Sequence, residues 1–278
     1  MPASSLLDLA TRLFWRATGR RVDLDGQHSW LGAPTSASPV VGDSWLEAFA
    51  RPRGWRLDPR PDAGLLPSLS DLDGPSFLAD HTPAAVRSFY ESTARWQLDV
   101  WSQWSPIFQP FGAIIGGLFG RRVQQLALPI RPLDVAHGMD NRVVPLMDGQ
   151  GSQRAAAWIR TIRATGETAF SGCYTVGTLP GHPQPLVHVS FPLESGNVQV
   201  YLTPVNHADG SVSLVSGAGR FGEPGTYVVV QMGGRHYARR IPIHEAFHLY
   251  VDADGVLRTD HELRLGRFTV LRLHYRLT

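Results

Sequence analysis

The C-terminal stretch from Ile241 to Thr278 constrains the fold more than any other part of this sequence. Two segments in which apolar and polar residues alternate flank Asp252-Ala253-Asp254-Gly255, which is a typical hairpin turn, and a third such segment ends the chain. A three-residue loop with Gly255 in the left-handed conformation fixes the register of the hairpin. That register pairs Val251 with Leu257, Phe247 with His261, and Ile243 with Leu265.

The same stretch contains His244-Glu245-Ala246-Phe247-His248, which has the spacing of a zinc-peptidase motif if it is helical. On a helix the two histidines lie about 6 Å apart and can share a metal ion. On a strand they lie about 13 Å apart, because each residue advances about 3.3 Å. The period of two, the hairpin turn and Pro242 at the strand start favour a strand. We therefore expect no metal site, and neither His261 nor His274 stands out as a third ligand.

In the predicted register Glu245 and His261 point to the apolar side of the hairpin as diagonal neighbours. A carboxyl group beside an imidazole in such a setting can perform acid and base catalysis at neutral pH. The alternatives are a buried pair with a structural role and a glutamate at the wet mouth of a cavity.

The composition excludes several function classes. The chain has 278 residues, 43% of them hydrophobic, which suffices for a substantial core. All basic residues are arginine, so a Schiff-base lysine and a phosphate-binding P-loop are excluded, and we expect no cofactor. The net charge of +2 argues against a nucleic-acid partner. Cys173 is the only cysteine, which excludes an internal disulfide and favours inert burial in a strand.

The first 128 residues are predicted to form a helical and irregular region. Residues 5–21 have the pattern of an amphipathic helix with a basic side, which either packs on the body of the protein or docks on an anionic membrane surface. Residues 34–83 are rich in proline, and we expect an irregular arm with a short helix near 44–50. A longer helix is predicted from Thr82 to Trp104, with Trp101 and Trp104 on its apolar side. It either packs on the β-domain or places these two tryptophans in a ligand cavity.

The most apolar part of the chain is the glycine-rich stretch 107–128. Proline and the short uninterrupted apolar length argue against a membrane span. Close packing on the body and a role as an interfacial or lid element both remain open. Together with residues 5–21, residues 107–122 give a membrane surface as a candidate partner.

Residues 129–278 read as a series of antiparallel strands joined by short turns, which is typical of a meander that curls into a barrel or half-barrel. Such a sheet either fills its interior with side chains or holds one small ligand. Polar residues that could line the interior are Arg160, Tyr174, His188, Gln199, Tyr201, Arg220, Glu245, His261 and Tyr275.

Residues from Trp158-Ile159-Arg160 through Ile241-Pro242-Ile243 and 257–261 to the terminal Tyr275-Arg276-Leu277 resemble uncharacterised bacterial β-rich domains, some of them attached to membrane proteins. The resemblance covers roughly residue 89 to the end. It implies a β-domain and carries no catalytic residue over.

We therefore predict an α+β protein, with an N-terminal region (1–128) wrapped on an antiparallel, barrel-like β-domain (129–278). The first function hypothesis is binding of a hydrophobic small molecule or lipid inside the β-domain, by Trp101, Trp104, Arg160, Tyr174, His188, Tyr201 and Tyr275. The second is a cofactor-free lyase, isomerase or cyclase with Glu245 and His261 as acid and base. The third is a module that docks on a membrane or a partner. A cytoplasmic protein, with or without membrane association, fits these expectations.

Overall fold

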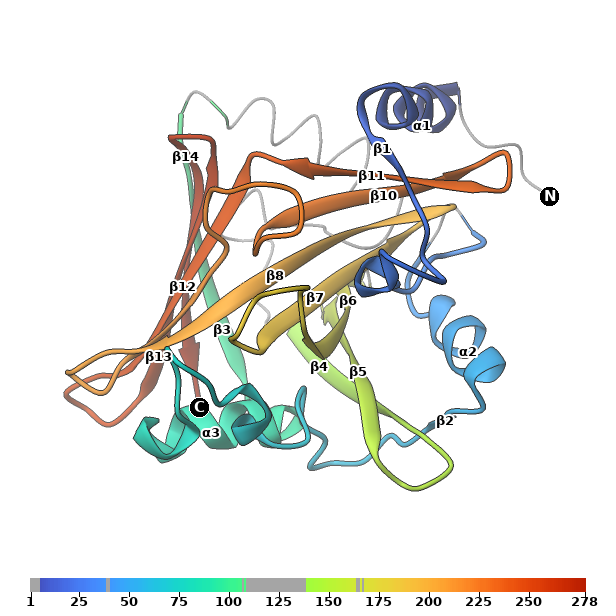
Figure 1. Ribbon diagram of the computed structural model, residues 1–278. Coiled ribbons are helices and arrows are strands. Elements are labelled where there is room, and N and C mark those ends of the chain that lie inside the picture. Colours follow the sequence, from blue (N-terminus) through green and yellow to red (C-terminus); the bar gives the residue numbers. More distant parts are fainter. Residues whose placement is uncertain (1–5, 39–40, 107, 109–138, 164–165, 167) are drawn as a thin grey trace.

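The computed structural model describes residues 6–38, 41–106, 108, 139–163, 166 and 168–278 (Figure 1). Apart from Phe108, the predicted interfacial element at 107–122 lies outside these residues.

In the described residues, fourteen strands form one branched sheet in which every strand pair is antiparallel. The main path runs β2, β4, β5, β6, β7, β8, β9, β12, β13, β14, β3, and a branch of β10, β11 and β1 leaves it at β8. The bounds on the main path are β2 Arg56–Leu57, β4 Met139–Met147, β5 Gln153–Ile162, β6 Thr168–Gly177, β7 Leu186–Leu193, β8 Gly196–Asn206, β9 Val212–Val215, β12 Ile243–Val251, β13 Leu257–Leu265, β14 Phe268–Leu277 and β3 Leu98–Trp104. In the branch they are β10 Thr226–Met232, β11 Arg235–Ile241 and β1 Arg20–Val22.

The long strand β8 joins the two parts of the sheet. Its residues 196–200 pair with β10, whereas 203–206 pair with β9. Figure 1 shows β7, β8, β10 and β11 running in a clearly different direction from β12, β13 and β14. The strands β11 and β12 are separated by Pro242, which has no N–H to donate to a ladder and which the sequence placed at a strand start.

The sheet formed by the described strands does not close into a barrel, so the barrel-like prediction is wrong in this respect. The main path ends at β2 on one side and at β3 on the other. Near the β3 end, the side chain of Asn141 in β4 bonds the chain just before β3. It donates to the carbonyls of Thr93 and Trp96 at 3.0 and 3.2 Å. Side-chain bonds thus link β4 to this segment, where a closed barrel would have a strand ladder.

The predicted helix 82–104 is correct only in its first part. The helix α3 spans Ala84–Glu91 and a 3-10 turn spans Thr93–Arg95, after which the chain becomes β3. Leu98 and Val100 are buried while Asp99 and Trp101 are exposed, which is the period of a strand. The strand β3 pairs along its whole length with β14. The N-terminal region therefore contributes strands to the sheet as well as helices.

The predicted short helix near 44–50 is confirmed as α2, Trp45–Ala50. Trp45 is fully buried against the outer side of β5 and β6, and its Nε1 donates to Oγ of Ser171 at 2.9 Å. Cys173 lies in the same cluster, and burial raises the pKa of its thiol to about 12. It is therefore a protonated core residue, as predicted.

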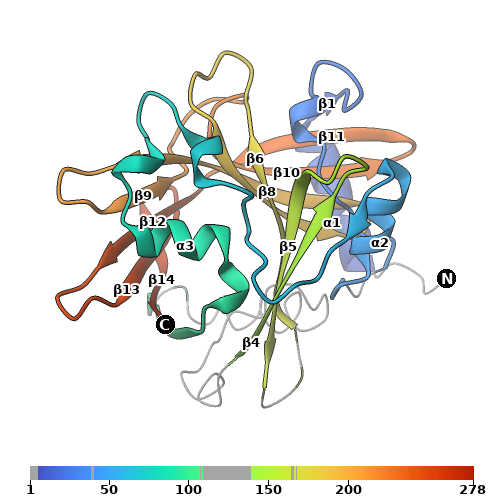
Figure 2. The same ribbon diagram turned by 90° about the horizontal axis from the view of Figure 1, so that it is seen from below.

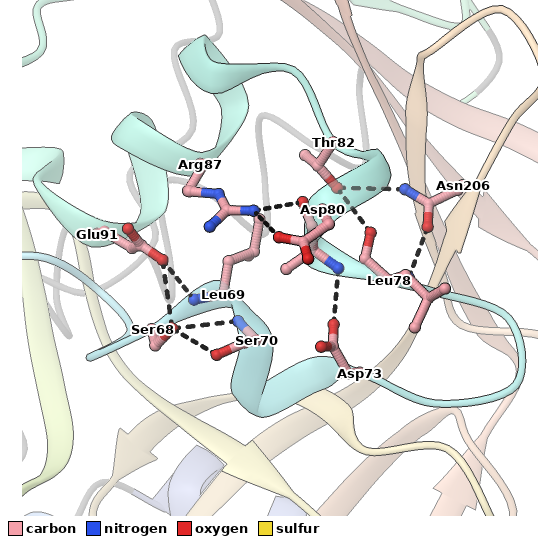
Figure 3. A network of polar contacts seen from close by, with 11 residues as sticks. Ser68, Leu69, Ser70, Asp73, Leu78, Asp80, Thr82, Arg87, Glu91 and Asn206 are labelled. Atoms are coloured by element: carbon pink, nitrogen blue, oxygen red, sulfur yellow. Dashed lines mark hydrogen bonds and ion pairs between the residues drawn. The ribbon is translucent and has the colours of Figure 1, made fainter.

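Besides α2 and β2, the predicted irregular arm (34–83) contains three 3-10 turns in the described residues: Arg51–Arg53, Leu69–Leu72 and Ala79–His81. Polar contacts within the arm and to β8 hold its last part in place (Figure 3). The side chain of Asn206, at the end of β8, accepts from the Leu78 N–H at 2.7 Å and donates to Thr82 Oγ1 at 3.2 Å. Glu91 accepts from the Leu69 N–H at 2.7 Å. Leucines and Phe77 of this arm are buried in the main core.

The first helix, α1 (Leu6–Thr18), lies along β10 and β11 (Figure 1). Trp15 packs on an apolar cluster of these strands. Leu9, Leu13 and Phe14 are exposed, by 40%, 45% and 53%. The helix thus packs on the body through only part of its apolar surface. None of the helices in the described residues is long and apolar enough to cross a membrane.

Candidate functional site

The C-terminal hairpin has the predicted register. Val251 pairs with Leu257, Phe247 with His261, and Ile243 with Leu265, and Gly255 has a φ of 76°. The His244–His248 motif lies in β12, where the two histidines pair with Arg264 and Asp260 across the ladder. Among the described residues, no group of three His, Cys, Asp or Glu side chains could hold a metal ion. The peptidase interpretation is therefore excluded by the extended backbone.

The two parts of the bent sheet enclose a cavity of about 260 Å³. Its wall comes mainly from β5–β8 and β12–β14, and α3 covers part of it with Phe89 and Tyr90. Figure 2 shows α3 between β5 and the strands β12–β14. Most of the wall is aliphatic, including Val187, Val189, Val198, Val200, Leu271 and Leu273. Successive side chains of a strand point to opposite sides of the sheet. The side chains of these strands that point away from the cavity therefore pack into separate clusters outside it.

Aromatic rings form one part of this wall. Trp158 lies edge to face with Phe89, Phe170 and Tyr174 at centroid distances of 6.2, 5.3 and 5.7 Å. Sequence reasoning singled out Arg160 and missed Trp158, although the period of a strand places residues 158 and 160 on the same side. Phe247 of β12 was likewise assigned to the apolar face, without a role at the site.

Glu245 and His261 both line the cavity, as predicted. Nε2 of His261 lies 3.4 Å from Oε2 of Glu245, and the two side chains are 11% and 15% exposed, respectively. Neither ring nitrogen of His261 has a hydrogen-bond partner among the described residues. The ring stacks on Phe247 with centroids 3.8 Å apart. This pair is close enough for an ionic interaction, and its unsatisfied nitrogens remain available to a further group.

Arg160, Tyr174 and Tyr275 line the cavity too, and with Glu245 and His261 we call them the polar cluster. Burial raises the pKa of Tyr174 well above its ordinary value; Tyr90, Glu245 and Tyr275 act in the same direction and Arg160 opposes them. Burial also raises the pKa of Tyr275, against the charge of Arg160. Both tyrosines therefore keep their hydroxyl protons at neutral pH and can donate hydrogen bonds.

Two predicted cavity residues, His188 and Tyr201, lie on the opposite side of β7 and β8. Their rings stack with centroids 4.2 Å apart. His188 bonds Thr175 through Nδ1 at 2.9 Å and Gln199 through Nε2 at 2.8 Å. The Tyr201 hydroxyl donates to the Trp30 carbonyl oxygen. This side of the sheet is a second core, which packs against the N-terminal segment 22–31.

The two predicted tryptophans lie outside the cavity as well. Trp101 is 52% exposed on the outer side of β3, beside His274 of β14. It lines a groove there with His248 and Asp260. Trp104 packs against a small cluster around Leu271 and Leu273 without reaching the cavity wall.

Comparison with known proteins gives one distant relative. The chain is 28% identical over 219 residues to the uncharacterized membrane protein YndJ of Bacillus subtilis (strain 168). The match covers 78% of this chain and 38% of that protein's length. It supports the resemblance to β-rich domains attached to bacterial membrane proteins. No family model and no solved structure matches the chain.

Proposed function

We propose that this protein binds a small, largely apolar molecule in the cavity of the bent sheet. The observation that supports this function is the unfilled volume of about 260 Å³ behind an aliphatic and aromatic wall. Ligand sites are concave, mostly apolar and marked by a few convergent polar groups, and this description fits the wall and its polar cluster.

The volume also carries an energetic argument. An empty apolar cavity lowers the stability of the folded protein by about 24 cal/mol per Å³, because its walls lack contacts. A cavity of this size therefore costs about 6 kcal/mol. That is a large fraction of the stability of a typical domain, about 5–15 kcal/mol. Apolar cavities tend to stay free of water and to accept apolar guests. An occupant that restores these contacts is therefore strongly favoured.

A cofactor-free lyase, isomerase or cyclase is the second candidate function. The specific observation in its favour is the 3.4 Å approach of the Glu245 carboxylate to His261 inside the cavity. One group can remove a proton from a bound molecule while the other returns it, provided that the ligand lies within hydrogen-bond reach of both. Exchange of Glu245 for glutamine would then abolish turnover while leaving binding in place.

Docking on a membrane is a third candidate, compatible with the first. It is supported by the exposed Leu9, Leu13 and Phe14 of α1 and by the name of the relative, a membrane protein. Arg16, which is exposed in the last turn of this helix, would face anionic lipid headgroups.

Thermal unfolding in the presence of decanol tests the first function. A ligand that binds only the folded protein at about 100 times its Kd stabilises it by about 2.7 kcal/mol. We expect decanol to raise the melting temperature of the wild type and to have a smaller effect on Val189→Phe, whose ring occupies part of the cavity. Val251→Phe, at an exposed position outside the cavity, is the matched control and should respond like the wild type. An equal response from Val189→Phe would place the binding elsewhere.

A further inference from the structure

Arg160 is the buried arginine of the described chain. The others in this part of the protein are exposed or half-buried, whereas Arg160 is 7% exposed. It lies in β5, two residues after Trp158, and both side chains face the cavity. The intervening Ile159 faces the opposite cluster. The strand geometry therefore fixes the guanidinium in the cavity wall.

The guanidinium has no carboxylate partner within 4.0 Å among the described residues. It contacts Sδ of Met139 at 3.6 Å and the rings of Trp158 and Tyr275, whose centroids lie 5.5 and 5.6 Å away, and it also interacts with the Tyr275 hydroxyl. The exposed Arg163, by contrast, has Asp140 at 2.7 Å. The Glu245 carboxylate lies next to His261 instead.

A buried guanidinium without a carboxylate partner is expected to bind an anion. Burial of a charge without a partner costs several kcal/mol, and arginine cannot escape the cost by losing its proton. The hydroxyl groups of Tyr174 and Tyr275, both in the polar cluster, are hydrogen-bond donors near this guanidinium. The Tyr174 hydroxyl makes no hydrogen bond to a described residue, and the Tyr275 ring lies over the guanidinium. A planar carboxylate can accept two parallel bonds from the guanidinium and a further one from a tyrosine.

We infer that the ligand is a monocarboxylic acid with a compact apolar body, whose carboxylate binds Arg160. This inference rests on the proposed function and specifies the ligand class. A phosphate would require more cationic donors than the single arginine that the described cavity wall provides. The apolar body of the acid would lie against the valines and leucines of β7, β8 and β14.

Isothermal titration with decanoate and decanol tests the inference, because the two probes share their apolar chain. For the wild type we expect decanoate to bind at least about tenfold more tightly than decanol. Arg160→Met removes the charge, keeps an unbranched apolar side chain, and should abolish this preference while retaining decanol binding. Arg163→Met removes an exposed arginine just after β5 and should keep the wild-type preference. Tyr275→Phe provides a second variant, in which the preference should fall by a smaller factor.

The outcomes separate the two proposals. Equal affinity of the wild type for both probes, or an undiminished preference in Arg160→Met, would overturn the carboxylate inference and leave the proposed binding function standing. Absence of binding of either probe to the wild type would overturn both. The comparison of the two probes on the wild type does not depend on the folding of any variant.

Discussion

Nε2 of His261 lies 3.4 Å from Oε2 of Glu245, diagonally across the β12–β13 ladder and inside the cavity. The hairpin turn at 252–255 sets this relationship, because a shift of the register by one residue would place the two side chains on opposite sides of the sheet. The pair therefore depends on turn chemistry and strand period, both of which are visible in the sequence.

The contribution of this pair to stability can be measured with a double-mutant cycle. Glu245→Leu or His261→Phe alone leaves one polar partner in an apolar wall, and we expect each to cost about 1–3 kcal/mol. The double variant replaces both with apolar groups and should be less destabilised than the sum of the two single variants. Urea unfolding of the four proteins supplies the values. Strict additivity would show that the two side chains do not interact.

The turn itself gives a second prediction. Gly255 adopts a φ of 76°, and no heavy atom lies within 4 Å of the position that a Cβ would occupy. Gly255→Ala should therefore destabilise the protein by about 1–2 kcal/mol through backbone strain alone. Gly149→Ala is the control, since that glycine has equally open space and no positive φ. Equal denaturant midpoints for the two variants would contradict the assigned turn.

The sequence predicted this hairpin but placed His188 and Tyr201 on the wrong side of their strands. Both sides of β7 and β8 are buried, one against the cavity and one against the N-terminal segment 22–31. Apolar residues therefore occur at both odd and even positions. The sequence pattern then does not indicate which side chains of these strands face the cavity. Polar residues of β5 and β6 were assigned to the interior, and Arg160 and Tyr174 do lie there.

The error over β3 has a different cause. Leu98, Val100, Trp101 and Trp104 fit a helical stripe as well as a strand, and aromatic residues favour strands. Pairing with β14, about 170 positions later in the sequence, determines that this segment is a strand and not a helix. The Val100–Tyr275 and Trp101–His274 pairs are examples. Whether β3 also pairs with β4 to close a barrel depends on the same kind of long-range contact, for which a local pattern carries no signal.

The buried His188 predicts a specific loss of stability in mild acid. Burial lowers its pKa from 6.5 to about 4, with an opposing contribution from its bond to Gln199. Below pH 6.5 the unfolded chain takes up a proton that the folded protein does not, so stability falls as the pH decreases from about 6.5 to about 4. The loss should reach about 3 kcal/mol at the acid end.

Thermal unfolding at pH 7.5 and 5.0 tests this effect, with His188→Gln as the variant that cannot take up the proton. The difference between the two pH values should be smaller in His188→Gln than in the wild type. An equal difference would assign the acid sensitivity to other groups.

The exposed surface of α1 predicts binding to anionic lipid vesicles. Leu13→Asp combined with Phe14→Asp should abolish sedimentation of the protein with such vesicles, because it puts charge where apolar contact is needed. Phe268→Asp is the control, since Phe268 is equally exposed at 54% but lies in the β13–β14 hairpin. Undiminished sedimentation of the α1 variant would exclude this helix as the docking surface.

The central claim is that the cavity of the bent sheet takes up a small apolar molecule, and native mass spectrometry after incubation with decanol tests it most directly. The wild type is expected to carry one decanol molecule per chain, and a smaller share of Val189→Phe is expected to carry it. A wild type without the adduct, or an equal adduct on Val189→Phe, would contradict the account.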